Sequence, residues 1–457
     1  MSRELPRGWV NTTIGEINDY SSCNIDPLKE PEQVFELYSV PIYPTGRPEY
    51  VRGQDIGSTK QSVEPGDVLL CKINPRINRV WMVGPKSEWP QIGSSEWVVI
   101  RQPLIHAGFL RYQLSESSFR EKLCSEVSGV GGSLTRAQPK KVATYSLVLP
   151  PTAEQTRIAA KLDELLAQVD TLKARIDGIP SLLKRFRQSV LAAAVSGRLT
   201  EGWRASSVPE DSTEYQSVDV LEPWSHTIEA PASWQMHIFE EVIKLVGGSQ
   251  PPKSEFSYEP KPGFVRLIQI RDYKSDSHKV FINQESTKKF CSARDVMIGR
   301  YGPPIFQILR GLEGAYNVAL MKAVPREGLN NEYMYWYLQN YKLLNFVEAG
   351  SDRTAGQSGV NKAFLEKYPL FIPPLDEQTE IVRRVEQLFA FADQLEAKVA
   401  SAKNRIDRLT QSILAKAFRG ELVPQDPNDE PASVLLERIK AQRAAAPKAK
   451  RGRKASA

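Results

Sequence analysis

The sequence is poor in cysteine and has no long apolar run. Its four cysteines are too scattered for Cys-x-x-Cys metal ligation or for a disulfide framework. No apolar stretch approaches the roughly 18 residues that a membrane-spanning helix needs. The first residues, Met1 to Pro6, also lack the apolar segment of a secretory signal. We therefore expect a cytoplasmic protein that does not contact a membrane.

Catalytic motifs are scarce too. The sequence contains no Gly-x-x-x-x-Gly-Lys-Ser/Thr motif for nucleotide phosphates, and the glycine-rich segment 129–132 lacks the Gly-x-Gly-x-x-Gly spacing of a dinucleotide site. It has no Asn-Pro-Pro-aromatic element, which amino-methyltransferases use at a flipped base. The four histidines show no ligand spacing such as His-x-x-x-His. The sequence therefore predicts a non-enzymatic chain with no catalytic, cofactor-binding or metal site.

The excess of positive charge is confined to one end of the chain. The formal net charge is +6, and the C-terminal end holds six basic side chains and no acid, which leaves 54 basic and 54 acidic residues before it. Bulk charge therefore says little about phosphate binding by the rest of the chain. The basic end itself is typical of a disordered, solubilising tail.

The most informative feature that is present is a long internal repeat. Residues 150–199 and 373–422 align without a gap and are identical at 19 of 50 positions. Both copies begin with Pro-Pro-x-x-Glu-Gln-Thr and end with Gly-x-Leu. The chain therefore consists of two halves with one common plan.

Apolar residues recur in both copies with alternating steps of four and three. This seven-residue spacing is typical of helices that supercoil around a partner, and the other copy is the obvious partner. We predict two helical spacers that pair as an antiparallel coiled coil, with a seam roughly 50 Å long. A separate amphipathic core helix would show a similar stripe. Gly178-Ile179-Pro180 predicts a kink or short break in the first spacer. The seam residues are Ile158, Leu162, Leu165, Val169, Leu172, Ile176, Leu183, Phe186, Ile381, Val385, Leu388, Leu395, Val399, Ile406, Leu409 and Ile413.

A region of mixed character precedes each spacer, and we predict that each forms an α+β domain. In the first region, four apolar runs of strand length lie between Gly, Pro or polar residues: Val68–Cys71, Val80–Val83, Trp97–Ile100 and Leu147–Leu149. Gly8-Trp9 and Asp67 to Leu70 have counterparts in Ser233-Trp234 and Asp295 to Ile298, but the two regions otherwise diverge. Divergent domains on a shared frame suit two recognition heads with different targets, and drift after duplication is the alternative.

The resulting plan has six parts. Residues 1–150 are the first domain, 151–199 the central helical spacer, 226–372 the second domain and 373–422 the C-terminal helical spacer. Residues 200–225, rich in Ser, Pro and acids, are expected to be a linker. Residues 423–457 are expected to hold a short helix over 432–446 and the basic tail.

Each α+β region contains windows with basic side chains and no acid. Arg and Lys suit phosphates and guanine edges, whereas Asn and Gln suit adenine. Surface loops of many proteins look similar, but recurrence at matching places in both halves favours binding to DNA. The candidate DNA-binding residues are Lys72, Arg76, Asn78, Arg79, Ser133, Arg136, Lys140, Lys141, Arg300, Tyr301, Gln307, Arg310, Arg353, Gln357, Ser358 and Lys362.

In its repeat, its helical spacers and its divergent α+β regions, the chain resembles the specificity (S) subunit of Type I restriction-modification systems. The resemblance covers nearly the whole chain and is strongest to the enteric Type IA branch. The recognition domains themselves do not transfer, because they vary with the DNA sequence that is read. The runs that carry the resemblance are Leu149–Gln155, Leu162–Asp170, Lys184–Gln188, Ile381–Phe389 and Gln411–Leu422.

The resemblance implies a non-catalytic subunit that reads a split, asymmetric target in double-stranded DNA, with one half-site for each α+β domain. The seam-bearing spacers would set the gap and dock two modification (methyltransferase) subunits, and restriction (endonuclease and translocase) subunits would join the assembly. S-adenosylmethionine, ATP and Mg²⁺ would belong to those partners. Two domains on one face of a duplex favour half-site centres about 10 base pairs apart. A coiled-coil scaffold without DNA specificity and a stand-alone DNA methyltransferase are the alternatives.

Overall fold

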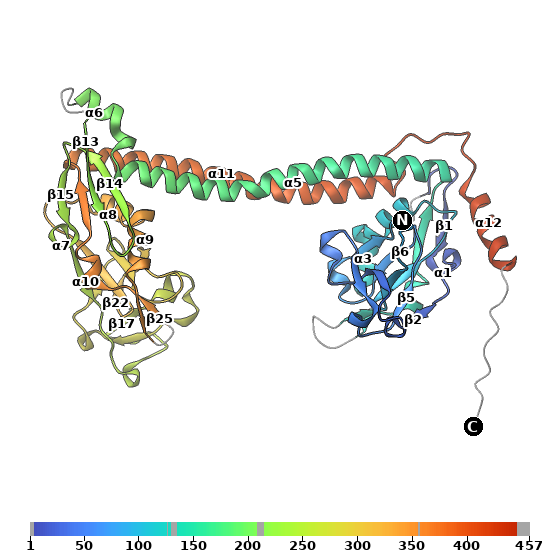
Figure 1. The fold of residues 1–457 in the computed structure, drawn as a ribbon, viewed down its shortest axis with the longest axis horizontal. Coiled ribbons are helices and arrows are strands. Elements are labelled where there is room, and N and C mark those ends of the chain that lie inside the picture. The colour runs from blue at the N-terminus through green and yellow to red at the C-terminus, as the bar shows by residue number, and fades with distance from the viewer. Residues whose placement is uncertain (1–3, 126, 129–134, 208–213, 355–356, 446–457) are drawn as a thin grey trace. The chain divides into compact units, whose positions relative to one another are not determined.

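The computed structural model describes residues 4–125, 127–128, 135–207, 214–354 and 357–445. The chain divides into two units: unit 1 contains residues 1–176 and 401–457, and unit 2 contains residues 177–400. Two long helices, α5 (Thr152–Val195) and α11 (Leu375–Ala417), contribute turns to both units (Figure 1). Unit 1 therefore combines two stretches that are far apart in the sequence.

Unit 1 is an α+β unit with three groups of paired strands besides a short hairpin. A five-stranded sheet has the order β2-β5-β8-β3-β4, a three-stranded sheet has the order β7-β6-β9, and β1 pairs with β12. The strands are β1 Val10–Thr13, β2 Asn24–Ile25, β3 Val34–Tyr38, β4 Glu49–Arg52, β5 Lys60–Ser62, β6 Val68–Cys71, β7 Val80–Met82, β8 Gln91–Ser94, β9 Trp97–Ile100, β10 Val127–Ser128, β11 Arg136–Ala137 and β12 Ser146–Leu149. The shorter helices are α1 Ile14–Ile17, α2 Ala107–Ser115, α3 Ser117–Ser125, α4 Pro139–Val142 and α12 Ala432–Ala445.

Strand β6 shows why unit 1 has cores on both faces of its three-stranded sheet. All four of its side chains are buried, and successive side chains of a strand point to opposite faces. Val68 and Leu70 therefore join the main core under the helices, whereas Leu69 and Cys71 join an aromatic cluster that includes Trp97. The four strands expected from apolar runs in this region, β6, β7, β9 and β12, are confirmed.

Unit 2 repeats this plan with different sheets. One four-stranded sheet has the order β16-β23-β20-β21, another has the order β18-β17-β22-β19, and β15 pairs with β26 as β1 pairs with β12. The strands are β13 Tyr215–Val220, β14 His226–Pro231, β15 Gln235–Ile238, β16 Ile243–Gly247, β17 Phe264–Ile268, β18 Phe281–Asn283, β19 Phe290–Cys291, β20 Val296–Gly299, β21 Gln307–Leu309, β22 Gly314–Tyr316, β23 Leu320–Pro325, β24 Asp352–Thr354, β25 Gln357–Gly359 and β26 Pro369–Ile372. The shorter helices are α6 Glu201–Ser207, α7 Phe239–Val242, α8 Asn331–Tyr337, α9 Tyr341–Ala349 and α10 Lys362–Leu365.

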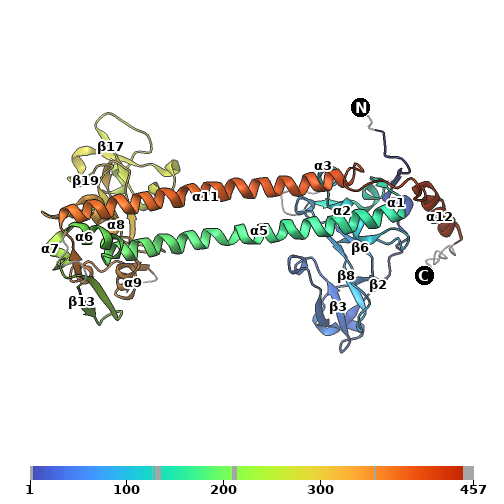
Figure 2. The ribbon, with the colours of Figure 1, turned by 90° about the horizontal axis from the view of Figure 1, so that it is seen from above.

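The two long helices pair within each unit. In unit 1, Leu162 at the start of α5 shares a core with Ile413 at the end of α11. In unit 2, Val190 near the end of α5 shares a core with Val385 near the start of α11. The start of each helix therefore meets the end of the other, and the expected antiparallel coiled coil is confirmed (Figures 1 and 2).

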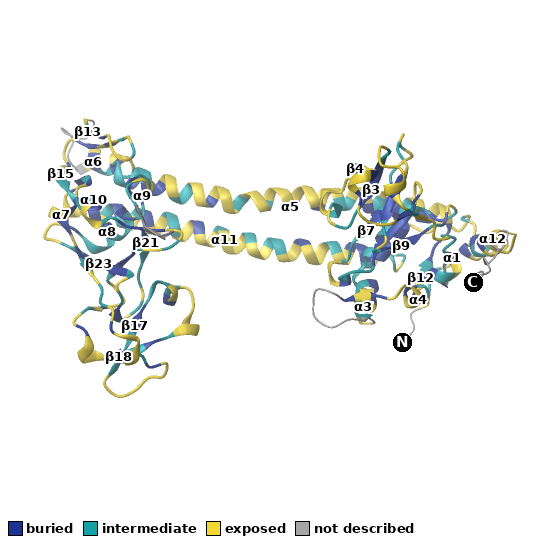
Figure 3. Ribbon diagram, turned by 60° about the horizontal axis from the view of Figure 1, so that its bottom comes forward, coloured by how far each residue is buried: buried dark blue, intermediate teal, exposed yellow. Residues whose placement is uncertain are grey.

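Burial along the seam is uneven. Figure 3 shows buried, intermediate and exposed residues alternating along both long helices. Most of the predicted seam side chains are buried or half-buried, but Leu172 and Leu409 are each 47% exposed. In a two-stranded coiled coil only one partner helix covers each seam side chain, and neither leucine belongs to a core shared with an α+β unit. Of the kink or short break expected at Gly178-Ile179-Pro180, the break is wrong, because α5 continues through Pro180, and the kink stays a prediction. A proline removes only one backbone donor, so the other hydrogen bonds of the helix can continue on both sides of it.

The segment expected to be a linker is largely regular structure. Residues 200–225 include helix α6 and strand β13, which pairs with β14 over six residues from Tyr215 to Val220. The linker was predicted from composition, but Ser and acidic residues are equally compatible with an exposed strand in a two-stranded sheet. The expected C-terminal helix is confirmed as α12, whereas the basic tail after it lies outside the described residues. None of the helices in the described part of the chain is long and apolar enough to cross a membrane.

Candidate nucleic-acid interface

In unit 1, the fold brings together the two basic windows that the sequence singled out. The hairpin β10–β11 lies beside the segment after β6, where Ile73 forms a bridge with Arg136. The backbone N–H of Asn74 donates to the carbonyl of Thr135 at 2.9 Å, and that of Ala137 donates to the carbonyl of Lys72 at 2.8 Å. Two loops that are well separated in the sequence therefore form one surface.

Several candidate side chains in this surface also hold the loops in place. The Lys72 ammonium donates to the carbonyl of Ser95 at 2.6 Å, and the Arg79 guanidinium donates to the carbonyl of Ile73 at 3.4 Å. Arg136 forms an ion pair with Glu96, with 3.2 Å between Nη2 and Oε1. Asn78 adopts a left-handed backbone with φ of 44° and donates its amide to the carbonyl of Ser115 at 2.9 Å.

Three further candidates in unit 1 are exposed on short helical segments. Arg76 is exposed on the short helical turn 75–77, and Lys140 and Lys141 are exposed on α4. Ser133 lies outside the described residues. Arg76, Lys140 and Lys141 are therefore the side chains of this group that a phosphate backbone could reach most directly.

Unit 2 places its candidate windows at the equivalent position. Tyr301, directly after β20, forms a bridge with Gly359 of the hairpin β24–β25, and the N–H of Val360 donates to the carbonyl of Arg300 at 2.9 Å. The Arg300 guanidinium lies 5.2 Å from the centre of the Tyr301 ring. Arg353, Gln357 and Ser358 are on the two strands of that hairpin, where Arg353 is paired with Ser358.

Other candidates of unit 2 have partners within the unit. Arg310 forms an ion pair with Glu332 at 2.5 Å and lies 3.7 Å from the centre of the Tyr335 ring. The Gln307 amide donates to the carbonyl of Pro304 at 2.9 Å. Lys362 is exposed at the start of α10 and pairs with Glu366, one turn later, at 3.3 Å. Exposed pairs of this kind are weak, so Lys362 can exchange its carboxylate for a phosphate.

The repeated Pro-Pro-x-x-Glu-Gln-Thr motif has a structural role that the sequence did not reveal. The buried carboxylate of Glu154 accepts the indole N–H of Trp9 at 2.9 Å, and in unit 2 Glu377 accepts the indole N–H of Trp234 at the same distance. Each motif therefore ties the start of a long helix to the segment just before β1 or β15. Both sides of this contact were visible as separate repeats, at offsets of 225 and 223 residues, but nothing in the sequence showed that they meet.

The glutamine of the motif fixes a second connection. The side-chain carbonyl of Gln155 accepts the backbone N–H of His106 at 3.0 Å, and the corresponding oxygen of Gln378 accepts the N–H of Asn330 at 2.7 Å. His106 and Asn330 are the N-caps of α2 and α8, where their side chains accept backbone N–H groups of the first turn. The motif thereby holds each recognition unit against its long helix at two points.

The two carboxylates differ in their remaining partners. Burial raises the pKa of Glu154, and the hydrogen bond from Trp9 and the charge of Arg157 offset part of that effect. Glu377 is paired with the buried guanidinium of Arg204 and accepts the Thr200 hydroxyl at 2.7 Å. The same frame therefore carries a neutralised carboxylate in unit 2 and a more weakly compensated one in unit 1.

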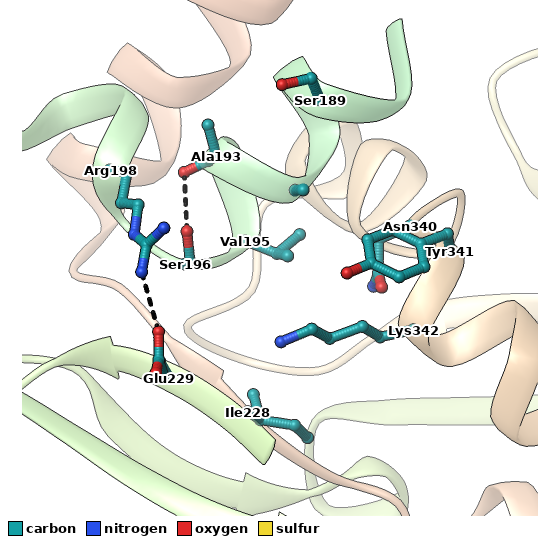
Figure 4. Close-up of a pocket in the computed structure, with 11 residues that line it drawn as sticks. Ser189, Ala193, Val195, Ser196, Arg198, Ile228, Glu229, Asn340, Tyr341 and Lys342 are labelled. Atoms are coloured by element: carbon teal, nitrogen blue, oxygen red, sulfur yellow. Dashed lines mark hydrogen bonds and ion pairs between the residues drawn. The ribbon is translucent and has the colours of Figure 1, made fainter. Parts of the chain in front are cut away.

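One cavity of unit 2 is lined by charged side chains that have partners within the unit. A cavity of about 290 Å³ lies between the end of α5 and the start of α9, and its Arg198 pairs with Glu229 at 2.9 Å (Figure 4). Lys342 in the same cavity donates to the carbonyl of Thr227 at 2.7 Å. Over the described residues, no group of three or more His, Cys, Asp or Glu side chains is placed to hold a metal ion.

A repeated helical frame that carries two dissimilar α+β units, each with basic loops joined at the same place, defines a two-headed recognition protein. The family described as "Type I restriction modification DNA specificity domain" matches residues 231–402. The chain is 34% identical to the Type I restriction enzyme EcoKI specificity subunit of Escherichia coli strain K12, over 99% of each chain. It is 37% identical to the EcoBI specificity subunit of Escherichia coli, over 67% of this chain and 66% of that one. The chain belongs to the family of Type I restriction enzyme specificity subunits.

Solved structures show the same fold. The HsdS subunit from Thermoanaerobacter tengcongensis matches with a TM-score of 0.59 and 23% identity, over 92% of this chain and 99% of that one. A chain from a structural study of the assembly and conformational transition of the type I R-M system matches with a TM-score of 0.67 and 21% identity, over 92% of this chain and all of that one. At this level of identity the likeness concerns the fold and not the individual contacts.

Proposed function

We propose that this chain is the DNA-reading subunit of a Type I restriction-modification complex. Units 1 and 2 each read one half of a split, asymmetric target in double-stranded DNA. The observation that carries this proposal is the meeting of two basic loop windows at the same place in two units whose sequences otherwise differ. Equal placement with different side chains suits two readers of different half-sites.

The paired helices α5 and α11 set the distance between the half-sites and carry the partner subunits. At 1.5 Å per residue, helices of 44 and 43 residues are each roughly 65 Å long, which is enough for half-site centres about one turn of DNA, or 10 base pairs, apart. Two modification subunits dock on this frame, and restriction subunits join the larger assembly. S-adenosylmethionine, ATP and Mg²⁺ are bound by those partners, and this chain contributes no catalytic group.

The test begins with methylome sequencing of cells that express the complete system, which identifies the target. Duplex binding by the assembled methyltransferase is then measured as a function of salt concentration. Arg76→Ala and the double variant Lys140→Ala, Lys141→Ala should weaken binding and lower the slope of log affinity against log salt by about one for each phosphate that is no longer neutralised. The matched control is Lys161→Ala, which should leave the slope unchanged; Lys161 lies on α5 with its side chain 40% exposed and pairs with Glu164.

Two experimental results would favour a different function. A coiled-coil scaffold would bind neither the target nor random duplex in a salt-dependent way. A stand-alone methyltransferase would bind S-adenosylmethionine as the isolated chain, which calorimetry would detect.

A further inference from the structure

Glu154 of unit 1 has a buried oxygen that lacks a partner. The residue is 1% exposed, and its Oε2 accepts the indole N–H of Trp9 at 2.9 Å. Its Oε1 is buried and has no hydrogen-bond partner in the described part of the chain. Glu154 also lines a cavity of about 430 Å³. Burying a carboxylate oxygen without a hydrogen bond costs free energy, so a donor bound at Oε1 would stabilise the site.

In unit 2, the corresponding oxygen has a donor. Glu377 Oε1 accepts the guanidinium Nη1 of Arg204, and Nη2 of the same guanidinium donates to the carbonyl of Gly197 at 2.6 Å. Arg204 is 3% exposed and Glu377 is 2% exposed. The place beside the carboxylate is therefore filled by an arginine that also bonds to the turn just after the long helix.

The two places correspond residue by residue. Pro6 and Trp9 of unit 1 match Pro231 and Trp234 of unit 2 at an offset of 225 residues. Gly420 and Gly197 follow the ends of α11 and α5, and each has φ of 73°. A Cβ on Gly420 would lie 2.6 Å from Pro6, just as a Cβ on Gly197 would lie 2.4 Å from Pro231. The cavity at Glu154 is thus the counterpart of the place that Arg204 occupies.

The chain after the two glycines explains why only one place is filled. After Gly197 the chain forms α6, which carries Arg204 back to the carboxylate. After Gly420 the chain runs as a loop to Pro431, and residues 424–431 contain no basic side chain. That loop adds Asp426 and Asp429 to the cavity wall, and Asp429 is paired with Arg157 at 2.6 Å. Arg7 also lines the cavity, but it is exposed.

We propose that the cavity at Glu154 is a binding site for a guanidinium group, supplied by an arginine side chain from outside the described residues. The arginine comes from a partner protein or from the basic C-terminal segment of this chain, which contains Arg451 and Arg453. Arginine suits the site better than lysine because its planar fork can bond to a carboxylate and to a second acceptor at once, as Arg204 does. This site is independent of DNA recognition.

The experiment uses the full chain and the indole ¹⁵N–H resonance of Trp9, which is assigned by its absence in Trp9→Phe. N-acetyl-arginine methylamide is the probe, and the matching citrulline derivative, which has the same shape without the charge, is its control. We expect a saturable shift of the Trp9 resonance with the arginine probe and none with the citrulline derivative. Glu154→Gln, which retains an acceptor for Trp9, should abolish the shift, whereas Glu229→Gln on the surface of unit 2 should leave it intact.

A second arm identifies the source of the arginine. A shift in the full chain means that the cavity is open to a partner, and a shift only in a chain that ends at Ala445 means that the C-terminal segment fills it. Arg204→Ala should open the equivalent site in unit 2, so that the Trp234 resonance responds to the same probe. The proposal is overturned if neither the full nor the shortened chain shows a saturable shift, if citrulline acts equally, or if the shift survives in Glu154→Gln. Because no DNA is present, none of these results depends on the proposed function.

Discussion

At the residue scale, the repeated glutamate is the best example of one motif in two electrostatic settings. Glu377 faces a buried guanidinium, whereas Glu154 has only an indole N–H within hydrogen-bond distance and a more distant arginine charge, among the described residues. A buried charge is stabilising or costly according to its partner. The same substitution should therefore destabilise the protein at Glu377 but not at Glu154.

Glu377→Gln should destabilise the protein by about 3 to 5 kcal/mol, because it leaves the Arg204 charge buried without a carboxylate. Glu154→Gln removes a charge that has no such partner and should be neutral or slightly stabilising at neutral pH. Calorimetric unfolding of the two variants beside the unmodified chain measures the difference. Equal destabilisation by both substitutions would contradict this difference between the two carboxylates.

The effect of Glu154→Gln should depend on pH. Burial raises the folded-state pKa of Glu154 above the ordinary value of 4.5. A raised carboxylate pKa means that the charged form costs stability above the folded-state pKa, and that this cost disappears as the pH falls below the unfolded-state value. The variant should unfold at a higher temperature than the unmodified chain at pH 7.5, and the gap should close toward pH 4. A gap that stays constant from pH 7.5 to pH 4 would argue against a strained carboxylate.

The sequence could suggest binding residues but not their partners. Arg136 and Arg310 were selected because their windows contain no acid, yet Glu96 and Glu332 reach them from other elements. The contact of Trp9 with Glu154 spans 145 residues and was equally invisible. Local composition reveals which side chains are basic, whereas tertiary pairing decides which of them are free to bind.

At the element scale, the seven-residue spacing predicted both long helices and their antiparallel pairing, because a buried seam imposes its period on the sequence. The spacing did not predict how deeply each position is buried. Leu162 is 0% exposed where α5 packs against the α+β unit as well as α11, whereas Leu172 is 47% exposed on the free part of the helix. The break expected at Pro180 is also wrong, because the loss of one backbone donor does not interrupt the helix on either side.

The two leucines provide a matched test of the seam. Leu162→Ala should cost about 2 to 5 kcal/mol, because it leaves a cavity in a closed core. Leu172→Ala should cost less than about 1 kcal/mol, because solvent already reaches much of that side chain. Thermal unfolding of the two single variants gives the comparison, and similar destabilisation by both would show that the seam is buried evenly.

At the scale of the whole molecule, the structure combines a shared frame with divergent units. The frame consists of the paired helices, the Trp–Glu contacts and the strand pairs β1–β12 and β15–β26. The sheets attached to it differ between the units in strand number and order. The repeat in the sequence predicted this division, but the divergent sheets could not be assigned, because their strands are short and pair over long sequence distances.

In the proposed function, the paired helices set the gap between two DNA half-sites. Ion pairs of Lys173 with Asp407 and of Arg187 with Asp393 define which turns face each other, so residues 172–178 and 402–408 form matching heptads. Deleting both heptads shortens each helix by about 10 Å, or roughly 3 base pairs of DNA. Methylome sequencing of cells with the shortened subunit should show the same two half-sites with a gap about 3 base pairs smaller. The same half-sites with an unchanged gap would contradict the account.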